Sequence, residues 1–200
     1  VTGKPVNKGG ISGRTEATGR GVKFALKAFF QNDNDVKKTG LKPGLKGKRI
    51  IVQGLGNVGY YAAKFLSNED GAKITHVIER DGSIVNHEGI DISSLKKHLL
   101  EKGTIKGFNG FIEAGAEILE EEADILIPAA MELVINEENA NRIKVPLIVE
   151  AANGPVSSSA DEILNQRGVI IIPDLYANAG GVTVSYFEWI KNLSRIRLGR

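Results

Sequence analysis

The chain has 200 residues, a length typical of one domain, and its 26 lysine and arginine residues nearly balance 24 aspartates and glutamates. This balance gives no reason to expect nucleic acid or a membrane surface as a partner. Cysteine is absent, which excludes disulfides and cysteine-ligated metals and favours an intracellular, reducing compartment. We expect no transmembrane helix, because no apolar run approaches roughly 18 residues, and no signal peptide is visible at the start.

The first 47 residues predict one helix between two polar segments. Residues 1–14 are polar and rich in glycine, and we expect an extended lead-in. Apolar side chains then recur on one helical face, which predicts a helix from Thr15 or Glu16 to Phe30, with Thr15 as its cap. Residues 31–47 are expected to form a polar loop.

From residue 48 onward, short apolar strands alternate with amphipathic helices. Strands are predicted at Lys48–Gln53, Lys73–Glu79, Ala123–Ile127, Leu147–Glu150 and Val169–Ile172. Helices are predicted directly after the first strand and at Ser93–Lys102, Glu137–Arg142, Ala160–Gln166 and Ala179–Leu193. Because these strands are apolar throughout, they indicate a mostly parallel sheet covered on both faces. The sequence therefore predicts one Rossmann-like, doubly wound α/β domain.

A glycine motif, Gly54-Leu55-Gly56-Asn57-Val58-Gly59, follows the first strand and opens a helix. In such motifs the first glycine permits a tight turn, the second lets the backbone approach a pyrophosphate, and the third allows close helix–strand packing. The helix N-terminus then offers N–H donors to the phosphates. Glu79 ends the next strand, where a carboxylate can accept the ribose hydroxyls of adenosine. The alternative is a glycine turn that binds no nucleotide.

Three further loops, at residues 128–130, 151–155 and 173–181, follow predicted strands. Ligands of doubly wound folds bind outside the carboxyl ends of the strands, so these loops could line one crevice. Asn153 and Asn178 could bond a carboxamide such as that of nicotinamide. Each asparagine alone could equally be a turn residue or a helix cap.

Taken together, these residues resemble the cofactor-binding domain of the glutamate dehydrogenase family, within the wider group of amino-acid dehydrogenases. The resemblance covers nearly the whole chain, and the segments that carry it are Thr2–Pro5, Ala17–Gly21, the glycine motif, Asp124–Ala130, Glu150–Pro155 and Pro173–Trp189. It implies oxidative deamination of L-glutamate to 2-oxoglutarate and ammonia, with NAD or NADP as hydride acceptor. It also implies a parent enzyme that is a homohexamer.

The resemblance also implies roles for individual residues. The implied cofactor-binding residues are Thr18, Gly54, Gly56, Asn57, Val58, Gly59, Glu79, Arg80, Ala129, Ala130, Asn153 and Asn178. The implied substrate-binding residues are Arg14, Asn178 and Ser185. An arginine and a hydroxyl are suitable donors for a side-chain carboxylate. Without the resemblance, Arg14 could be a surface charge and Ser185 could bond its own helix carbonyl.

Two charged neighbours bear on the choice of cofactor. Glu79 would repel the 2′-phosphate of NADP, whereas Arg80 could pair with it. We therefore expect a preference for NAD that leaves NADP possible.

The family's catalytic lysine and aspartate belong to a separate substrate domain, so no catalytic residue is expected in this chain. Lys8 is interpreted as a solvated lysine. The three histidines show no metal-ligand spacing. Ser185 favours an acidic substrate, but a leucine- or phenylalanine-type dehydrogenase and a non-catalytic nucleotide-binding module remain alternatives. The sequence leaves cytoplasm and mitochondrion equally open.

Overall fold

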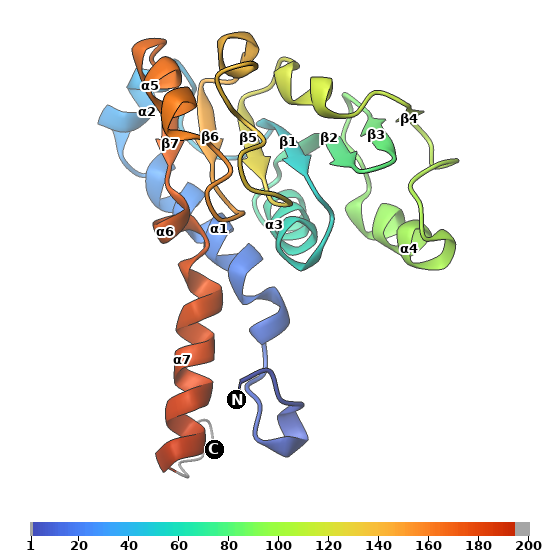
Figure 1. The fold of residues 1–200 in the computed structure, drawn as a ribbon, viewed down its shortest axis with the longest axis vertical. Helices are drawn as coiled ribbons and strands as arrows, with labels where there is room; N and C mark the ends of the chain where they lie inside the picture. Colours follow the sequence, from blue (N-terminus) through green and yellow to red (C-terminus); the bar gives the residue numbers. More distant parts are fainter. Residues whose placement is uncertain (1, 195–200) are drawn as a thin grey trace.

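The computed structural model describes residues 2–194, and their strands form one seven-stranded sheet in the order β4-β3-β2-β1-β5-β6-β7 (Figure 1). The strands are β1 (Arg49–Gln53), β2 (Lys73–Glu79), β3 (Gly82–Val85), β4 (Phe111–Ile112), β5 (Ile125–Pro128), β6 (Leu147–Val149) and β7 (Ile170–Ile172). Five of them run parallel, and β3 and β4 continue the sheet in antiparallel pairing beyond β2. The predicted α/β class with a mostly parallel sheet is confirmed.

Helices cover both faces of this sheet, and the last of them extends away from it (Figure 1). They are α1 (Arg14–Phe30), α2 (Asp33–Thr39), α3 (Asn57–Asn68), α4 (Ile92–Lys102), α5 (Ser158–Gln166), α6 (Asp174–Ala177) and α7 (Ala179–Ser194). Short 3-10 turns are η1 (Val6–Lys8), η2 (Ala116–Glu120) and η3 (Ala140–Arg142). Residues of α1, α2, α3 and α4 pack into the core on one face, and residues of η2, η3 and α5 pack into the core on the other.

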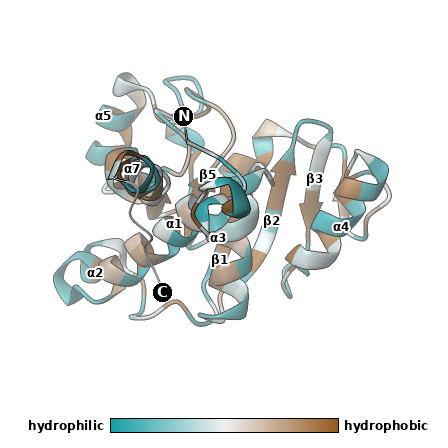
Figure 2. Cartoon of the chain, turned by 90° about the horizontal axis from the view of Figure 1, so that it is seen from below, coloured by the Kyte–Doolittle hydropathy of each residue, from teal (hydrophilic) through white to brown (hydrophobic). Residues whose placement is uncertain are grey.

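Strand β1 shows why the strands are apolar throughout. Ile50 and Val52 point into the core beneath α1 and α3, whereas Ile51 points into the core beneath η2 and α5, and all three are fully buried. Successive side chains of a strand face opposite sides, so a strand covered on both sides needs apolar residues at every position. In Figure 2, β1 and β2 are mostly hydrophobic, whereas α2 and α4 carry many hydrophilic residues.

Helix α1 lies between α3 and α7, and small residues bring the helices close together. A Cβ on Gly19 would lie 2.6 Å from the backbone nitrogen of Ala62 in α3, and one on Gly180 would lie 2.5 Å from the Ala17 carbonyl oxygen. Glycine is therefore needed for these backbone approaches. Helix α7 extends away from the sheet with the N-terminal segment beside it (Figure 1).

The structure corrects three local predictions. Residues 31–47 are not simply a loop, because α2 lies within them: the side chain of Asn32 caps it, and Val36 is buried beneath it. Helix α1 begins after Gly13, whose left-handed conformation and lack of a capping side chain replace the predicted Thr15 cap. The helix predicted at Glu137–Arg142 is reduced to the 3-10 turn η3, which covers only Ala140–Arg142.

Candidate cofactor-binding site

The carboxyl ends of β1, β5, β6 and β7 lie at one edge of the sheet, because these strands are parallel neighbours. The glycine motif follows β1, and residues 129–130 follow β5. The chain crosses from one half of the sheet to the other between β1 and β5, which is the position where doubly wound folds bind their ligands. The sheet topology therefore brings these loops to one edge of the sheet, as the sequence predicts.

The three glycines of the motif meet different surroundings. Gly54 has a φ of +87°, a conformation that favours glycine, and a Cβ there would lie 2.7 Å from the Cβ of Ala130. A Cβ on Gly59 would overlap the carbonyl oxygen of Gly54. Gly56 differs, since a Cβ there would have no atom within 4 Å and its φ of −67° suits any residue. The motif is therefore packed tightly at both ends and open at its middle glycine.

Gly56 is also the N-cap of α3, and it offers no side chain to bond the first N–H groups of that helix. Asn57 and Val58 form the first turn, so their backbone donors face the open side of the motif. A helix of 12 residues also carries a positive dipole at this end. The space left by Gly56, next to unpaired donors, fits a pyrophosphate, which brings negative charge and hydrogen-bond acceptors.

Glu79, at the end of β2, bonds directly to the glycine motif. The backbone N–H of Leu55 donates to Glu79 Oε1 at 2.5 Å. This bond fixes the carboxylate beside the motif, where the sequence predicts the adenosine ribose. Each carboxylate oxygen can accept two hydrogen bonds, so Oε2 and the second lone pair of Oε1 remain for the two ribose hydroxyls. Arg80 follows at the exposed end of the strand.

A cleft of about 1130 Å³ opens at the same edge of the sheet and extends towards α7. Its walls include most of the predicted site residues, namely Arg14, Thr18, Asn57, Val58, Ala129, Ala130, Asn153, Asn178 and Ser185. Glu79, Arg80 and the three glycines of the motif are not part of its walls. The structure therefore places the residues predicted for nicotinamide and substrate in one cleft and those predicted for the adenosine ribose beside it.

Asn153 and Asn178 contact each other across two loops. The Asn178 side-chain amide donates to Asn153 Oδ1 at 2.7 Å. The same loops are joined by Glu150, whose buried carboxylate accepts the backbone N–H of Asp174 at 2.9 Å, and by Asp174, which accepts the N–H of Gly154. Burial raises the pKa of Glu150, and the nearby carboxylate of Asp174 raises it further. Two acidic side chains therefore hold the asparagine pair against the cleft.

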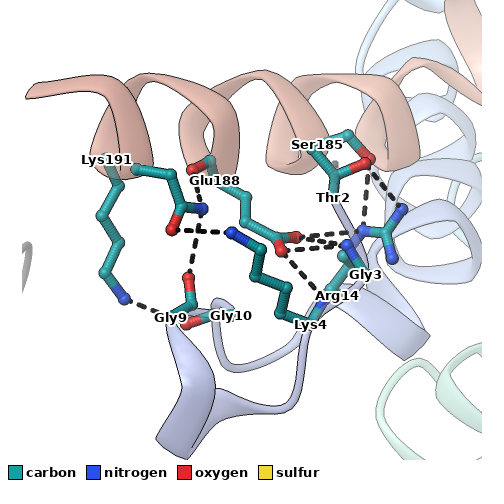
Figure 3. Close-up of polar contacts among 10 residues, drawn as sticks. Thr2, Gly3, Lys4, Gly9, Gly10, Arg14, Ser185, Glu188 and Lys191 are labelled. Atoms are coloured by element: carbon teal, nitrogen blue, oxygen red, sulfur yellow. Dashed lines mark hydrogen bonds and ion pairs between the residues drawn. The ribbon is translucent and has the colours of Figure 1, made fainter.

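Arg14 and Ser185 lie together on the wall of the cleft (Figure 3). The Nε–H of Arg14 donates to Ser185 Oγ at 3.2 Å and lies 3.4 Å from a carboxylate oxygen of Glu188. The guanidinium is 37% exposed, so Arg14 is more than a surface charge, and Ser185 bonds a different element of the fold. Arg14 Nη2 also donates to Thr2 Oγ1 at 3.5 Å, so the guanidinium is fixed at two of its nitrogens on the wall of the cleft.

Glu188 is the group that sequence reasoning missed. Its side chain is fully buried in α7 and accepts the backbone N–H groups of Gly3 and Lys4 at 2.9–3.0 Å (Figure 3). These bonds, with the charge of Arg14, lower the pKa of Glu188. Glu188 stands three residues after Ser185, which puts both on one helical face, and this spacing was the available signal.

Further bonds attach the N-terminal segment to α7. The Lys191 ammonium donates to the carbonyl oxygen of Gly10 at 2.9 Å, and the Asn192 amide donates to that of Gly9. The predicted extended lead-in contains the short turn η1 and lies along this helix. Residues 3–6 thereby form part of the cleft wall.

Two other features of the described residues concern alternative site types. Among residues 2–194, no group of three or more His, Asp or Glu side chains is arranged to hold a metal ion. No helix in that range is long and apolar enough to cross a membrane.

Two of the three histidines contact each other. His76 and His87 form an edge-to-face ring pair, and burial of His76 lowers its pKa.

Comparison with known proteins identifies one family. The model of the Glutamate/Leucine/Phenylalanine/Valine dehydrogenases matches residues 9–199. The chain is 54% identical over 203 residues to a probable glutamate dehydrogenase of Sinorhizobium fredii, covering 100% of this chain and 45% of that protein. It is also 54% identical over 202 residues to a mitochondrial glutamate dehydrogenase of Dictyostelium discoideum, covering 100% and 40%. The chain spans less than half the length of these relatives.

Solved structures agree with this fold. A hetero-hexameric glutamate dehydrogenase of Thermus thermophilus in a leucine-bound form is 31% identical with a TM-score of 0.87, and the match covers 100% of this chain and 45% of that one. A glutamate dehydrogenase of Peptoniphilus asaccharolyticus is 36% identical with a TM-score of 0.75, and covers 98% and 44%.

Proposed function

Because the chain belongs to the Glutamate/Leucine/Phenylalanine/Valine dehydrogenase family, we propose that it is the dinucleotide-binding domain of a longer glutamate dehydrogenase. The observation that supports this best is the glycine motif. Gly54 and Gly59 are fixed by close protein contacts, whereas Gly56 faces open space at the start of α3. A pyrophosphate lying against that position would account for the absence of a side chain there.

In this proposal the cofactor supplies hydride acceptance, and the chain supplies binding and orientation. The N–H groups at the start of α3 bond the pyrophosphate, and Glu79 bonds the adenosine ribose. Thr18, Ala130 and the Asn153–Asn178 pair surround the nicotinamide half in the cleft. The bonds from Glu150 and Asp174 keep that pair in place, so its amide groups would be positioned to bond the carboxamide of the nicotinamide.

The substrate proposed is L-glutamate, which would be oxidised to 2-oxoglutarate and ammonia. Arg14 and Ser185 would bind its side-chain carboxylate at the far end of the cleft, and Asn178 would contact the substrate near the nicotinamide. Glu188 and Ser185 fix the Nε end of Arg14, and Nη2 bonds Thr2 at 3.5 Å, so the carboxylate would be bound chiefly by Nη1. An apolar substrate such as leucine would leave these donors unpaired, which costs binding energy.

For the cofactor, we propose a preference for NAD over NADP. The Glu79 carboxylate lies at the ribose position, and two like charges about 4 Å apart repel by roughly 4 kcal/mol at an effective dielectric constant near 20. Arg80 reduces this preference because its exposed guanidinium can reach a 2′-phosphate. The parent enzyme is proposed to be a hexamer, like the relative from Thermus thermophilus.

The proposal is tested with the full-length protein by following NADH formation from NAD with L-glutamate and, separately, with L-leucine. Turnover on glutamate with at least tenfold lower kcat/KM on leucine supports it. The opposite ranking would support the leucine-type alternative. Saturable NADH binding without turnover on any amino acid would support a non-catalytic nucleotide-binding module.

A further inference from the structure

Lys96 in α4 forms a hydrogen bond to the glycine motif, although the motif itself lies between β1 and α3. Its ammonium donates to the carbonyl oxygen of Leu55 at 2.7 Å. The backbone N–H of the same Leu55 donates to Glu79 at 2.5 Å. One residue of the motif is therefore bonded by a carboxylate through its N–H and by an ammonium through its C=O. Leu55 thus lies between two opposite charges at the place proposed for the adenosine ribose.

The surroundings of Lys96 keep its charge near the motif. Its side chain is half-buried, and its ammonium lies 5.6 Å from the ring centre of Tyr60 in α3. Among residues 2–194, no carboxylate forms an ion pair with it. The next lysine differs: Lys97 is 76% exposed, points to solvent and lies 3.9 Å from the carboxylate of Glu101. Lys96 is thus a cation whose only strong described partner is a neutral backbone carbonyl.

We propose that Lys96 is a further residue that determines cofactor selectivity, by pairing with the 2′-phosphate of NADP. This rests on the proposed function, because the ribose position is that assigned to Glu79. A phosphate accepts a hydrogen bond from an ammonium more strongly than a neutral carbonyl does. Lysine carries its charge on a flexible four-carbon stem, so the ammonium can leave Leu55 and reach an adjacent phosphate. With NAD, Lys96 keeps its bond to Leu55.

Lys96 and Arg80 approach the ribose position from different elements. Arg80 lies at the exposed end of β2, whereas Lys96 reaches from α4 and is already ordered against the motif. Together they place two positive charges against the single carboxylate of Glu79. We expect this arrangement to let the site accept NADP in spite of Glu79, and Lys96 to contribute more than Arg80 because less of its freedom is lost on binding.

The experiment measures NADH and NADPH binding to the 200-residue chain by fluorescence titration. The variants are Lys96→Met, which keeps the apolar stem and removes the charge, and Lys97→Met as the matched control on the same helix. Lys96→Met should weaken NADPH binding about tenfold or more, which corresponds to one charged hydrogen bond. NADH binding should change less than threefold, and Lys97→Met should alter neither. Lys96→Arg should restore NADPH binding in part, since it retains a cation.

Several results would overturn the inference while leaving the proposed function intact. These are an equal loss of NADH and NADPH binding in Lys96→Met, no change in either, or wild-type protein that binds NADH and not NADPH. Failure of wild-type protein to bind either nucleotide would instead refute the proposed function. If Lys96→Met does not fold, Lys96→Gln is titrated in its place: NADPH binding should weaken about tenfold, and NADH binding should change less than threefold. Equal changes in the two affinities would contradict the inference.

Discussion

Arg14 and Glu188 form an ion pair between the first turn of α1 and the middle of α7, with Arg14 Nε 3.4 Å from the Glu188 carboxylate. The carboxylate is fully buried, whereas the guanidinium is 37% exposed at the cleft. Burying a carboxylate is costly unless donors surround it, and here two backbone N–H groups and Arg14 do so. Glu188 therefore fixes the N-terminal segment to α7 and also positions Arg14, which faces the proposed substrate.

The pH dependence of Glu188→Gln follows from its lowered pKa. Because folding lowers this pKa below its ordinary value of about 4.5, the carboxylate stabilises the fold above pH 4.5 and less as the pH falls further. We expect Glu188→Gln to lower the melting temperature by several degrees at pH 7, with a smaller difference from wild type at pH 3.5. Thermal unfolding at both pH values measures this.

Glu162→Gln is the control for that comparison, because Glu162 is an exposed carboxylate in α5. It should leave stability unchanged at both pH values. A Glu188→Gln deficit that is equal at pH 7 and pH 3.5 would show that the charge of Glu188 does not stabilise the fold.

Ser185→Ala tests the substrate end of the cleft in the full-length protein. We expect the KM for L-glutamate to rise about tenfold, because a hydrogen bond to a charged group contributes roughly 1.5–3 kcal/mol. The kcat should fall much less, and thermal stability should change little. Steady-state kinetics measure this, with Thr183→Ala, an exposed hydroxyl on the same helix, as control. An unchanged KM would remove Ser185 from the substrate site.

Gly59→Ala and Gly56→Ala should differ in their effect on the stability of the fold, although both positions belong to one motif. A Cβ on Gly59 would overlap the Gly54 carbonyl oxygen, so Gly59→Ala should destabilise the fold by about 1–3 kcal/mol. Gly56→Ala meets open space and should melt within a degree or two of wild type. Thermal unfolding followed by circular dichroism measures both, and equal losses would contradict the assigned environments.

Sequence patterns predicted the parallel sheet and the placement of its loops well, because both follow from local features. Apolar strands and the Gly54–Gly59 spacing are short-range signals. The Glu188 anchor and the Lys96–Leu55 bond could not be predicted in the same way, since each joins segments that are distant in the chain. Helix α2 was missed because its seven residues are mainly polar and only Val36 and Thr39 are buried.

The 200-residue chain alone should not oxidise glutamate. Hydride transfer requires the substrate α-carbon to be held against the nicotinamide, and such positioning is worth about 7–11 kcal/mol. It also requires a base, and the family resemblance implies that the catalytic lysine and aspartate belong to a separate substrate domain. The chain with NAD and saturating L-glutamate should show no NADH absorbance increase. Turnover that disappears in Gly56→Val would mean that the chain holds a complete active site.

The most direct test of the cofactor-binding assignment is calorimetric titration of NADH into the wild-type chain and into Gly56→Val. Because the φ of Gly56 is accessible to any residue and a Cβ there has no atom within 4 Å, the variant should fold normally. Our account predicts saturable NADH binding by the wild type, and at least a hundredfold weaker binding by Gly56→Val with an unchanged melting temperature. Equal binding by the two proteins, or no saturation of the folded wild type at millimolar NADH, would contradict it.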